Sequence, residues 1–310
     1  MAVPDFQTLM LPVLKSFSEG DAETPLKEVR KRVAAAEQLT EDDLAAMLPS
    51  GTQRVFNNRV AWAVIYLERA GLLMRVRRGV YRMAPEGEQV LGQAPTRIDM
   101  EFLGRFPAYA AWRKAGNKTQ TKEQNGNKAT KDSAETPEEA LESAAQQLRD
   151  ALELDLLKRV RSSEPAFLEQ VVLDLLVAMG YGGGDPSMGR ITGRSGDGGI
   201  DGTIREDTLG LDEVYVQAKK YAADNTVGAS ALRNFAGAID AAGTSKGVFV
   251  TTARFTQAAR QYVALSPKRI VLIDGEELAR LMVTHNIGVR TRVTHEIKRI
   301  DEDYFSEETQ

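Results

Sequence analysis

The chain has no cysteine and only two histidines among its 310 residues. The lack of cysteine excludes disulfides and thiolate metal sites. His285 and His295 are too far apart in sequence to share a helical face, so a histidine-rich zinc site is not expected. Any metal ion would have to be held by oxygen ligands, as Mg²⁺ is.

Long apolar runs are missing as well. The first residues, MAVPDFQTLM, lack a basic region followed by an apolar stretch, and no run of about 18 apolar residues occurs in the chain. We therefore expect a cytoplasmic protein with no membrane partner. With 42% hydrophobic and 27% charged residues, the composition is typical of a soluble globular protein, and a length of 310 residues favours two domains.

The net charge of −4 by itself argues against a nucleic-acid partner, but the basic residues are unevenly distributed. Between Arg54 and Arg82 the chain has seven arginines, no lysine and one acid, Glu68, so this segment carries a net charge of +6. Arginine in place of lysine favours bidentate contacts to phosphate or guanine. A solvated charged face is the alternative interpretation.

Apolar residues at helical spacing predict three helices in the N-terminal region, over residues 6–17, 26–36 and 55–70. The segment LLMRVRRGVYRM then predicts two short strands around a turn at Arg78-Gly79. Three helices followed by a basic hairpin are typical of a winged helix, whose third helix enters the major groove while the hairpin touches the DNA backbone or minor groove. The DNA-binding residues predicted on this basis are Arg54, Asn57, Asn58, Arg59, Arg75, Arg77 and Arg78. For Asn58 a capping or turn role is equally open.

A polar segment divides the chain. From Trp112, the sequence KAGNKTQTKEQNGNKATKDSAE has almost no apolar residue larger than Ala, which indicates a flexible linker. Thr136, Pro137 and Glu139 then form the pattern of a capping box at a helix start. The leucines expected to give this helix one packed apolar face are Leu141, Leu148, Leu152 and Leu156. We expect a winged-helix domain over residues 1–95, a connecting segment and linker over 96–136, and a second domain over 137–300.

In the second domain, strand and helix signals alternate, which predicts a mixed α/β sheet flanked by helices. Four polar residues break its hydrophobic pattern. In the strand IDGTI, Asp201 points away from the apolar face, and in VYVQAK, Gln217 and Lys219 do the same. In the helix over 165–179, Glu169 lies on the apolar side, where an isolated carboxylate is costly. An inward lysine indicates an anionic partner, and we take a phosphate as the candidate.

The stretches GDGGIDG, YVQAKKY and GVFVTTARFTQAA resemble the Mrr family of type IV restriction endonucleases, and VFNNRVAWAVIYLERAGL and RRGVYRM resemble that family's N-terminal DNA-binding domain. The resemblance implies a catalytic domain of the PD-(D/E)xK class in a QxK variant, Mg²⁺-dependent phosphodiester cleavage, and double-stranded DNA with foreign methylation as the substrate. It places Asp201 on the metal-binding aspartate, Gln217 on the position that most of the superfamily fills with Asp or Glu, and Lys219 on the catalytic lysine. Glu169 falls on the acidic residue of the preceding helix.

The chemistry of these residues agrees with that resemblance. Asp201, Glu169 and Gln217 can offer oxygen ligands to Mg²⁺ or to Mn²⁺ in its place, and Lys219 can orient or deprotonate the attacking water or neutralise the phosphate. Structural roles are the alternatives: a turn for Asp201, a strand hydrogen bond for Gln217 and protection of a strand edge for Lys219. One site per chain favours a homodimer or larger assembly on DNA, because two strands must be cut.

Two other functions compete with cleavage. A DNA-binding regulator with a nuclease-like domain that does not cleave is conceivable, because Gln217 is neutral. A nucleotide-binding enzyme that uses GDGGIDG is disfavoured, because a GxGxxG motif that begins at Gly196 would have Asp201 in place of its last glycine.

Overall fold

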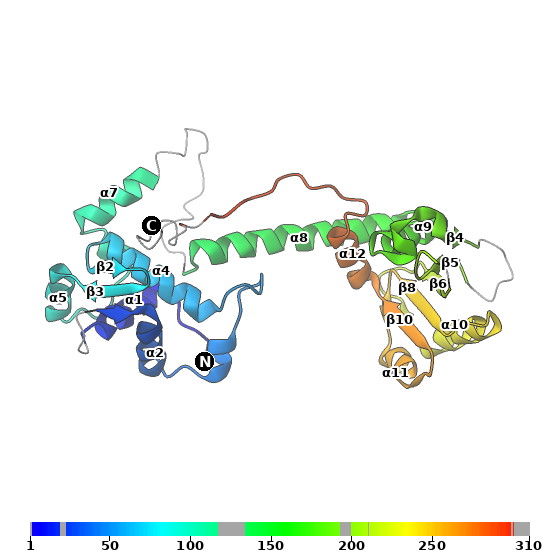
Figure 1. Cartoon of the computed structure of the whole chain (residues 1–310), viewed down its shortest axis with the longest axis horizontal. Helices are drawn as coiled ribbons and strands as arrows, with labels where there is room; N and C mark the ends of the chain where they lie inside the picture. Colours follow the sequence, from blue (N-terminus) through cyan, green and yellow to red (C-terminus); the bar gives the residue numbers. More distant parts are fainter. Residues whose placement is uncertain are drawn as a thin grey trace, which may run out of the picture. The chain divides into compact units, whose positions relative to one another are not determined.

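The structure is a computed structural model that describes residues 2–18, 23–116, 134–192, 200–209, 211–298 and 300 (Figure 1). The chain divides into two compact units, one within residues 1–146 and the other over residues 147–298. Most of the predicted polar linker and residues 196–199 of GDGGIDG lie outside the described residues. Within the described ranges, no helix is both long and apolar enough to cross a membrane.

The first unit contains the three predicted helices as α1 (Phe6–Ser16), α2 (Leu26–Ala36) and α4 (Val55–Arg69). A short helix that the sequence pattern did not predict, α3 (Glu41–Ala45), lies between the last two. The predicted hairpin is present as β2 (Leu73–Arg77) and β3 (Val80–Met83), and β1 (Thr24–Pro25) completes a sheet of order β1-β3-β2. Three helices with a hairpin are the arrangement expected of a winged helix.

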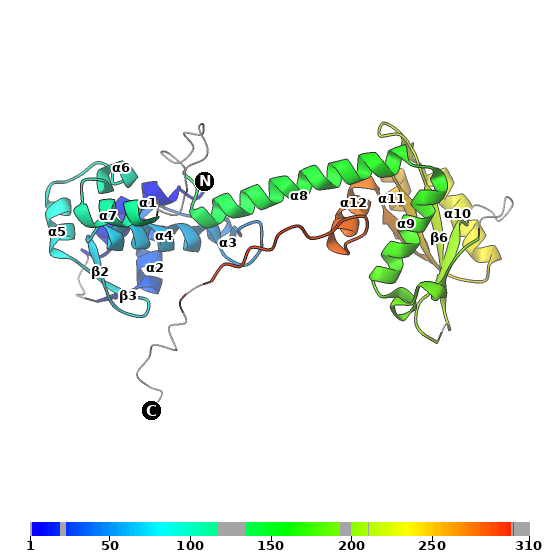
Figure 2. The same ribbon diagram turned by 90° about the horizontal axis from the view of Figure 1, so that it is seen from above.

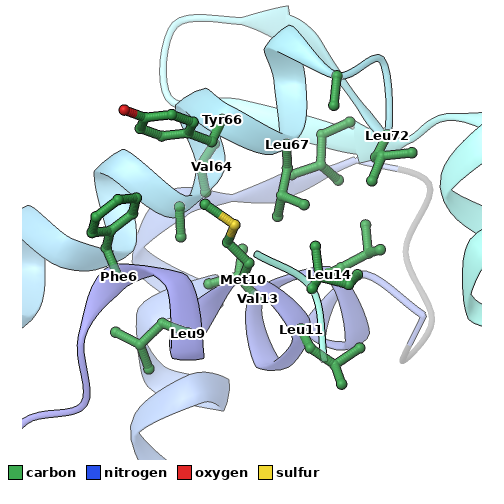
Figure 3. Packing of buried hydrophobic residues seen from close by; sticks show 14 of the residues in the cluster. Phe6, Leu9, Met10, Leu11, Val13, Leu14, Val64, Tyr66, Leu67 and Leu72 are labelled. Carbon is green, nitrogen blue, oxygen red and sulfur yellow. The ribbon is translucent and has the colours of Figure 1, made fainter. Parts of the chain in front are cut away.

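Helices α1 and α4 supply much of the first core (Figure 3). The core positions predicted for α4 are Val60, Ala63, Val64 and Leu67, and each is at most 1% exposed. Burying an aliphatic side chain of this kind contributes about 1.5–3 kcal/mol. The core therefore fixes α4, whose first turn carries the predicted base-reading residues.

Residues 96–116 differ from the prediction of a connecting segment. After α5 (Pro85–Gly92), the chain forms α6 (Met100–Leu103) and α7 (Pro107–Gly116). Ile98 and Leu103 are 0% exposed and Tyr109 is 1% exposed, all within the first core. These apolar residues precede the polar composition that begins near Trp112, and they bury enough surface to pack into the first core.

Helix α8 (Pro137–Ser162) begins with the predicted capping box, in which Glu139 N–H donates to Thr136 Oγ1 over 3.1 Å and Thr136 N–H donates to Glu139 Oε2 over 2.8 Å. Its predicted apolar face is packed only near the C-terminal end. Leu156 is 6% exposed, whereas Leu148 is 74% exposed. The expectation that this leucine face packs is therefore met at Leu156, where the last turns reach the second core, and is wrong for Leu148.

The second unit is built on one five-stranded sheet of order β10-β8-β6-β5-β4. Strands β4, β5 and β6 pair antiparallel, and β6, β8 and β10 pair parallel, so the sheet is mixed as predicted. Its strands are β4 (Gly189–Ile191), β5 (Gly202–Arg205), β6 (Glu213–Lys219), β8 (Lys246–Thr251) and β10 (Arg269–Ile273). The two-residue strands β7 (Thr226–Val227) and β9 (Arg254–Phe255) pair beside it.

Helices cover both faces of this sheet (Figures 1 and 2). Helices α9 (Pro165–Ala178) and α12 (Gly275–Thr284) pack on the face that carries Val214, Val216 and Ala218. Helices α10 (Ala229–Ala241) and α11 (Gln257–Leu265) pack on the opposite face, which carries Tyr215 and Phe249. The alternation along β6 therefore runs as the sequence predicts, with Gln217 and Lys219 on the face of Tyr215.

Candidate active site and DNA-binding surface

Asp201 lies directly before β5, beside the C-terminal end of the neighbouring strand β6. Its backbone N–H donates to the carbonyl of Val216 over 2.9 Å. Its Oδ2 accepts a hydrogen bond from the backbone N–H of Ala218 over 2.8 Å. The next residue, Gly202, allows β4 to pair closely, because a Cβ there would lie 2.9 Å from the carbonyl oxygen of Arg190. The carboxylate of Asp201 is thus fixed against the last residues of β6.

Gln217 stands between the two residues of β6 that bond to Asp201. Its side chain is buried, at 6% exposed. Lys219, two residues on, ends the strand and is half-buried.

Glu169 lies on α9 and is half-buried. Burial raises the pKa of its carboxyl, the charge of Asp201 raises it further, and the ammonium of Lys219 lowers it. Asp201 and Lys219 therefore both lie within electrostatic reach of Glu169. The structure therefore brings together Glu169, Asp201 and Lys219, as the sequence predicts, with Gln217 beside Asp201.

These side chains offer oxygen donors of the kind that bind a hard divalent cation. Within the described residues, no group of three or more His, Cys, Asp or Glu side chains is arranged to hold a metal. A cation here would be held by the two carboxylates and the amide oxygen of Gln217, with water or a substrate phosphate as the other ligands. Mg²⁺ is commonly bound in this way, by one or two carboxylates with several waters retained.

Two further residues at this strand end, Thr251 and Thr252, were missed by the sequence reasoning. Both are 0% exposed, and both bond to the backbone that follows Gln217. Their only signal in the sequence is the pair of threonines that ends the apolar run GVFVTT. Since their partners are more than 30 residues away, the pattern alone does not identify what they bond to.

At the other predicted site, Asn58 is not on a free helix face. It is 1% exposed, its Oδ1 accepts from the hydroxyl of Thr136 over 2.7 Å, and its Nδ2 donates to Gln53 Oε1 over 3.3 Å. The same amide nitrogen bonds to the carboxylate of Glu138. In this structure Asn58 therefore holds the start of α8 and cannot reach a base edge, which is a correction to the sequence interpretation.

Arg59 also bonds to the start of α8. Its Nε pairs with Glu139 Oε1 over 2.8 Å, with side chains 20% and 9% exposed respectively. Its Nη1 also donates to the carbonyl of Pro4 over 3.2 Å. A DNA contact through Arg59 thus requires the start of α8 to leave α4.

The remaining predicted DNA contacts lie on exposed or partly exposed surface. Arg54 occupies the N-cap position of α4 and is exposed, and Asn57 is half-buried in the first turn. Arg75, Arg77 and Arg78 are all exposed on the hairpin, where the β2–β3 register shifts between Arg75 and Arg77. Arg77 pairs with Glu23 over 2.8 Å, and both side chains are largely exposed, so the pair is weak.

Two parts of the chain match known families. Residues 160–282, which include all four predicted catalytic residues, match the family described as Restriction endonuclease. Residues 6–93 match the family described as Mrr N-terminal domain. The mixed sheet and its polar strand ends thus belong to a nuclease domain of the restriction-endonuclease class.

A curated relative matches almost the whole chain. The protein is 34% identical over 309 residues to the type IV methyl-directed restriction enzyme EcoKMrr of Escherichia coli (strain K12), with 98% of this chain and 100% of the relative covered. The chain therefore belongs to the Mrr family of restriction endonucleases, as its motifs indicate, and is an endodeoxyribonuclease.

Two solved structures show a more distant likeness. The DNA modification-dependent restriction endonuclease AspBHI is 19% identical, with 68% of this chain and 53% of its own covered and a TM-score of 0.37. The MspJI restriction endonuclease in complex with a 27-mer oligonucleotide is also 19% identical, with 64% and 43% covered and a TM-score of 0.31. The match spans only about half of these two chains, and it adds nothing to the assignment of residues.

Proposed function

We propose that the protein is a type IV restriction enzyme that cleaves double-stranded DNA carrying foreign methylation, in a Mg²⁺-dependent reaction in the cytoplasm. The observation that carries the proposal is the cluster where β5 begins beside the end of β6. Gln217 is buried there next to the residues that bond to Asp201, and Asp201 and Lys219 both lie within electrostatic reach of Glu169. The name of the full-length relative, a methyl-directed enzyme, supports the choice of substrate.

Asp201, Glu169 and Gln217 are the proposed ligands of the cation. Bound Mg²⁺ would stabilise the negative charge that develops on the phosphate, and Mn²⁺ offers the same octahedral oxygen chemistry. The fixed position of Asp201 supports this role, because its Oδ2 is already held by the amide of Ala218 and the carboxylate has little freedom to turn.

Lys219 is the proposed partner of the scissile phosphate and its attacking water. A lysine can orient or deprotonate that water, or stabilise the phosphate charge as a point cation. Its half-buried place at the strand end, where its ammonium lowers the pKa of Glu169, supports this role.

The proposed DNA-binding surface is the first turn of α4 with the hairpin, through Arg54, Asn57, Arg75, Arg77 and Arg78. Asn58 and Arg59 would join it only in a state in which the start of α8 has left α4. Since each chain offers one cleavage site, a homodimer or larger assembly on DNA is the proposed cutting form.

The test is digestion of matched methylated and unmethylated plasmids with Mg²⁺, with Mn²⁺ and with a chelator. We expect cleavage of methylated DNA only, and only with metal. Asp201→Ala and Lys219→Ala should each abolish cleavage while DNA affinity stays within a few-fold. Asp224→Ala, an exposed carboxylate outside the cluster, is the control and should cleave as the parent does.

The same experiment tests the alternative function, a DNA-binding regulator whose nuclease-like domain does not cleave. Binding of DNA without any nicking, under every metal condition, would favour a regulator. Full cleavage by Asp201→Ala or Lys219→Ala would remove that residue from the mechanism.

A further inference from the structure

The backbone that carries Lys219 is held by side chains as well as by the sheet. Lys219 is the last residue of β6 and pairs in register with Thr251 of β8. Its carbonyl accepts a hydrogen bond from the Thr251 hydroxyl over 2.8 Å and another from the backbone N–H of Thr252 over 3.3 Å. The strand end is therefore tied to β8 at the residue whose side chain is proposed to act on the phosphate.

The next threonine continues this connection past the end of the strand. The hydroxyl of Thr252 donates to the carbonyl of Tyr221 over 2.8 Å and accepts from the N–H of Tyr221 over 2.8 Å. One side chain thus satisfies both backbone groups of a residue that has left the sheet. Both threonines are 0% exposed, so water does not compete for these bonds.

The threonines are themselves held in place. The Thr251 hydroxyl accepts from the N–H of Ala253 over 3.2 Å. The carbonyl of Thr252 accepts two bonds from Arg161 of α8, from Nε over 3.0 Å and from Nη2 over 2.7 Å. A Cβ at Gly275 would lie 2.5 Å from that carbonyl oxygen, so α12 begins in close contact with it. Thr251 and Thr252, which we call the threonine clamp, are therefore held by Ala253, by Arg161 and by the start of α12.

From these contacts we infer that Thr251 and Thr252 are positioning residues, whose hydroxyls set the path of the backbone at 219–221 and hence the place from which the Lys219 side chain starts. The inference rests on the proposed catalytic role of Lys219. The side chain of a lysine has a fixed length, so the position of its Cα limits the places that its ammonium can reach. A displacement of about 1 Å in a catalytic group can cost about 100-fold in rate.

The test compares Thr251→Val and Thr252→Val with Thr251→Ser and Thr252→Ser in the full-length protein. Valine keeps the shape and the strand propensity but removes the hydroxyl, while serine keeps the hydroxyl. We expect the valine variants to lose about 10- to 100-fold in kcat with KM for DNA unchanged. The serine variants should stay within about threefold, because the bonds remain.

Thr244→Val is the matched control. The Thr244 hydroxyl also bonds to a β6 carbonyl, that of Glu213 over 3.2 Å, but at the opposite end of the strand. It should leave kcat unchanged. Midpoints of thermal unfolding for all variants separate a general loss of stability from a selective loss of turnover.

The outcomes are distinct. Cleavage retained by Lys219→Ala would overturn the proposed role of Lys219 itself. If Lys219→Ala is inactive but both folded valine variants turn over as the parent does, the clamp inference is wrong. Should a valine variant fail to fold, the double variant Thr251→Ser, Thr252→Ser decides, because a folded protein that loses about tenfold in kcat despite keeping both hydroxyls would refute the inference.

Discussion

Replacing Asn58 with alanine should lower the stability of the first unit, as is expected of a residue with a structural role and not of a surface residue that contacts only DNA. The change removes the bond that Asn58 accepts from the buried hydroxyl of Thr136 over 2.7 Å, the bond it donates to Gln53 over 3.3 Å and its contact with Glu138. Each missing bond costs about 0.5–1.5 kcal/mol, and a buried hydroxyl left without an acceptor adds about 1–3 kcal/mol. We expect a loss of at least about 2 kcal/mol in the free energy of unfolding.

The assay is urea unfolding of the full-length chain followed by tryptophan fluorescence. The two tryptophans of the protein, Trp62 and Trp112, both lie against the first core, so the signal reports on that unit selectively. Asn57→Ala is the matched control, because it makes the same exchange in the same helix turn at a half-buried residue. Both variants gain the same helix propensity. The difference between their free energies of unfolding therefore reports the bonds between Asn58 and the start of α8.

The two substitutions should also differ in their effects on DNA binding and on the urea midpoint. Asn57→Ala should weaken binding and leave the urea midpoint nearly unchanged, whereas Asn58→Ala should lower the midpoint. Equal midpoints for the two variants would refute the reasoning, because they would mean that Asn58 does not hold the start of α8. Asn58 would then return to the set of residues that read DNA bases.

Three other changes test the candidate site and the basic surface. Gln217→Glu should tighten Mg²⁺ and Mn²⁺ binding, since a carboxylate is a stronger ligand for a hard cation than an amide; equal affinities by calorimetry would show that Gln217 does not touch the metal. Glu169→Gln should raise the thermal midpoint of the metal-free protein at neutral pH, because a carboxyl whose pKa is raised by burial and by Asp201 disfavours folding when it is ionised. That gain should vanish as the pH falls and the carboxyl of the parent is protonated in both states, and a constant gain at all pH values would contradict it. Arg54→Ala with Arg77→Ala should reduce the salt slope of DNA binding by about 1 for each of the two arginines that binds a phosphate, and an unchanged slope would mean that these arginines only solvate the surface.

Features determined by nearby residues could be predicted from the sequence. The capping box joins Thr136 and Glu139, which are three residues apart, and its two hydrogen bonds are present in the structure. The hairpin turns at Arg78-Gly79 because Gly79 takes a positive φ of 66°, where glycine has no steric penalty. Alternation along β6 likewise placed Gln217 on the correct face, because a strand repeats every two residues.

Features that depend on distant contacts could not be predicted in the same way. Asn58 and Thr136 are 78 residues apart, and Lys219 and Thr251 are 32 residues apart. Which of two polar residues on a helix turn is buried depends on what packs over it, and no local pattern contains that information. For the same reason both Asn57 and Asn58 were predicted to contact DNA, with a capping or turn role as the alternative for Asn58, and only the structure separates them.

The charge of the candidate site gives a physical reason for an amide at position 217. Glu169, Asp201 and Lys219 together carry one net negative charge, and the pKa of Glu169 is already raised by its burial and by Asp201. A third carboxylate in place of Gln217, which is 6% exposed, would have to be buried beside Asp201, where an unpaired ion is costly. A divalent cation and one DNA phosphate together bring one net positive charge. On the proposed function, the site with Gln217 therefore reaches charge balance when metal and DNA are both present, whereas the site of the Gln217→Glu variant would need a further positive charge.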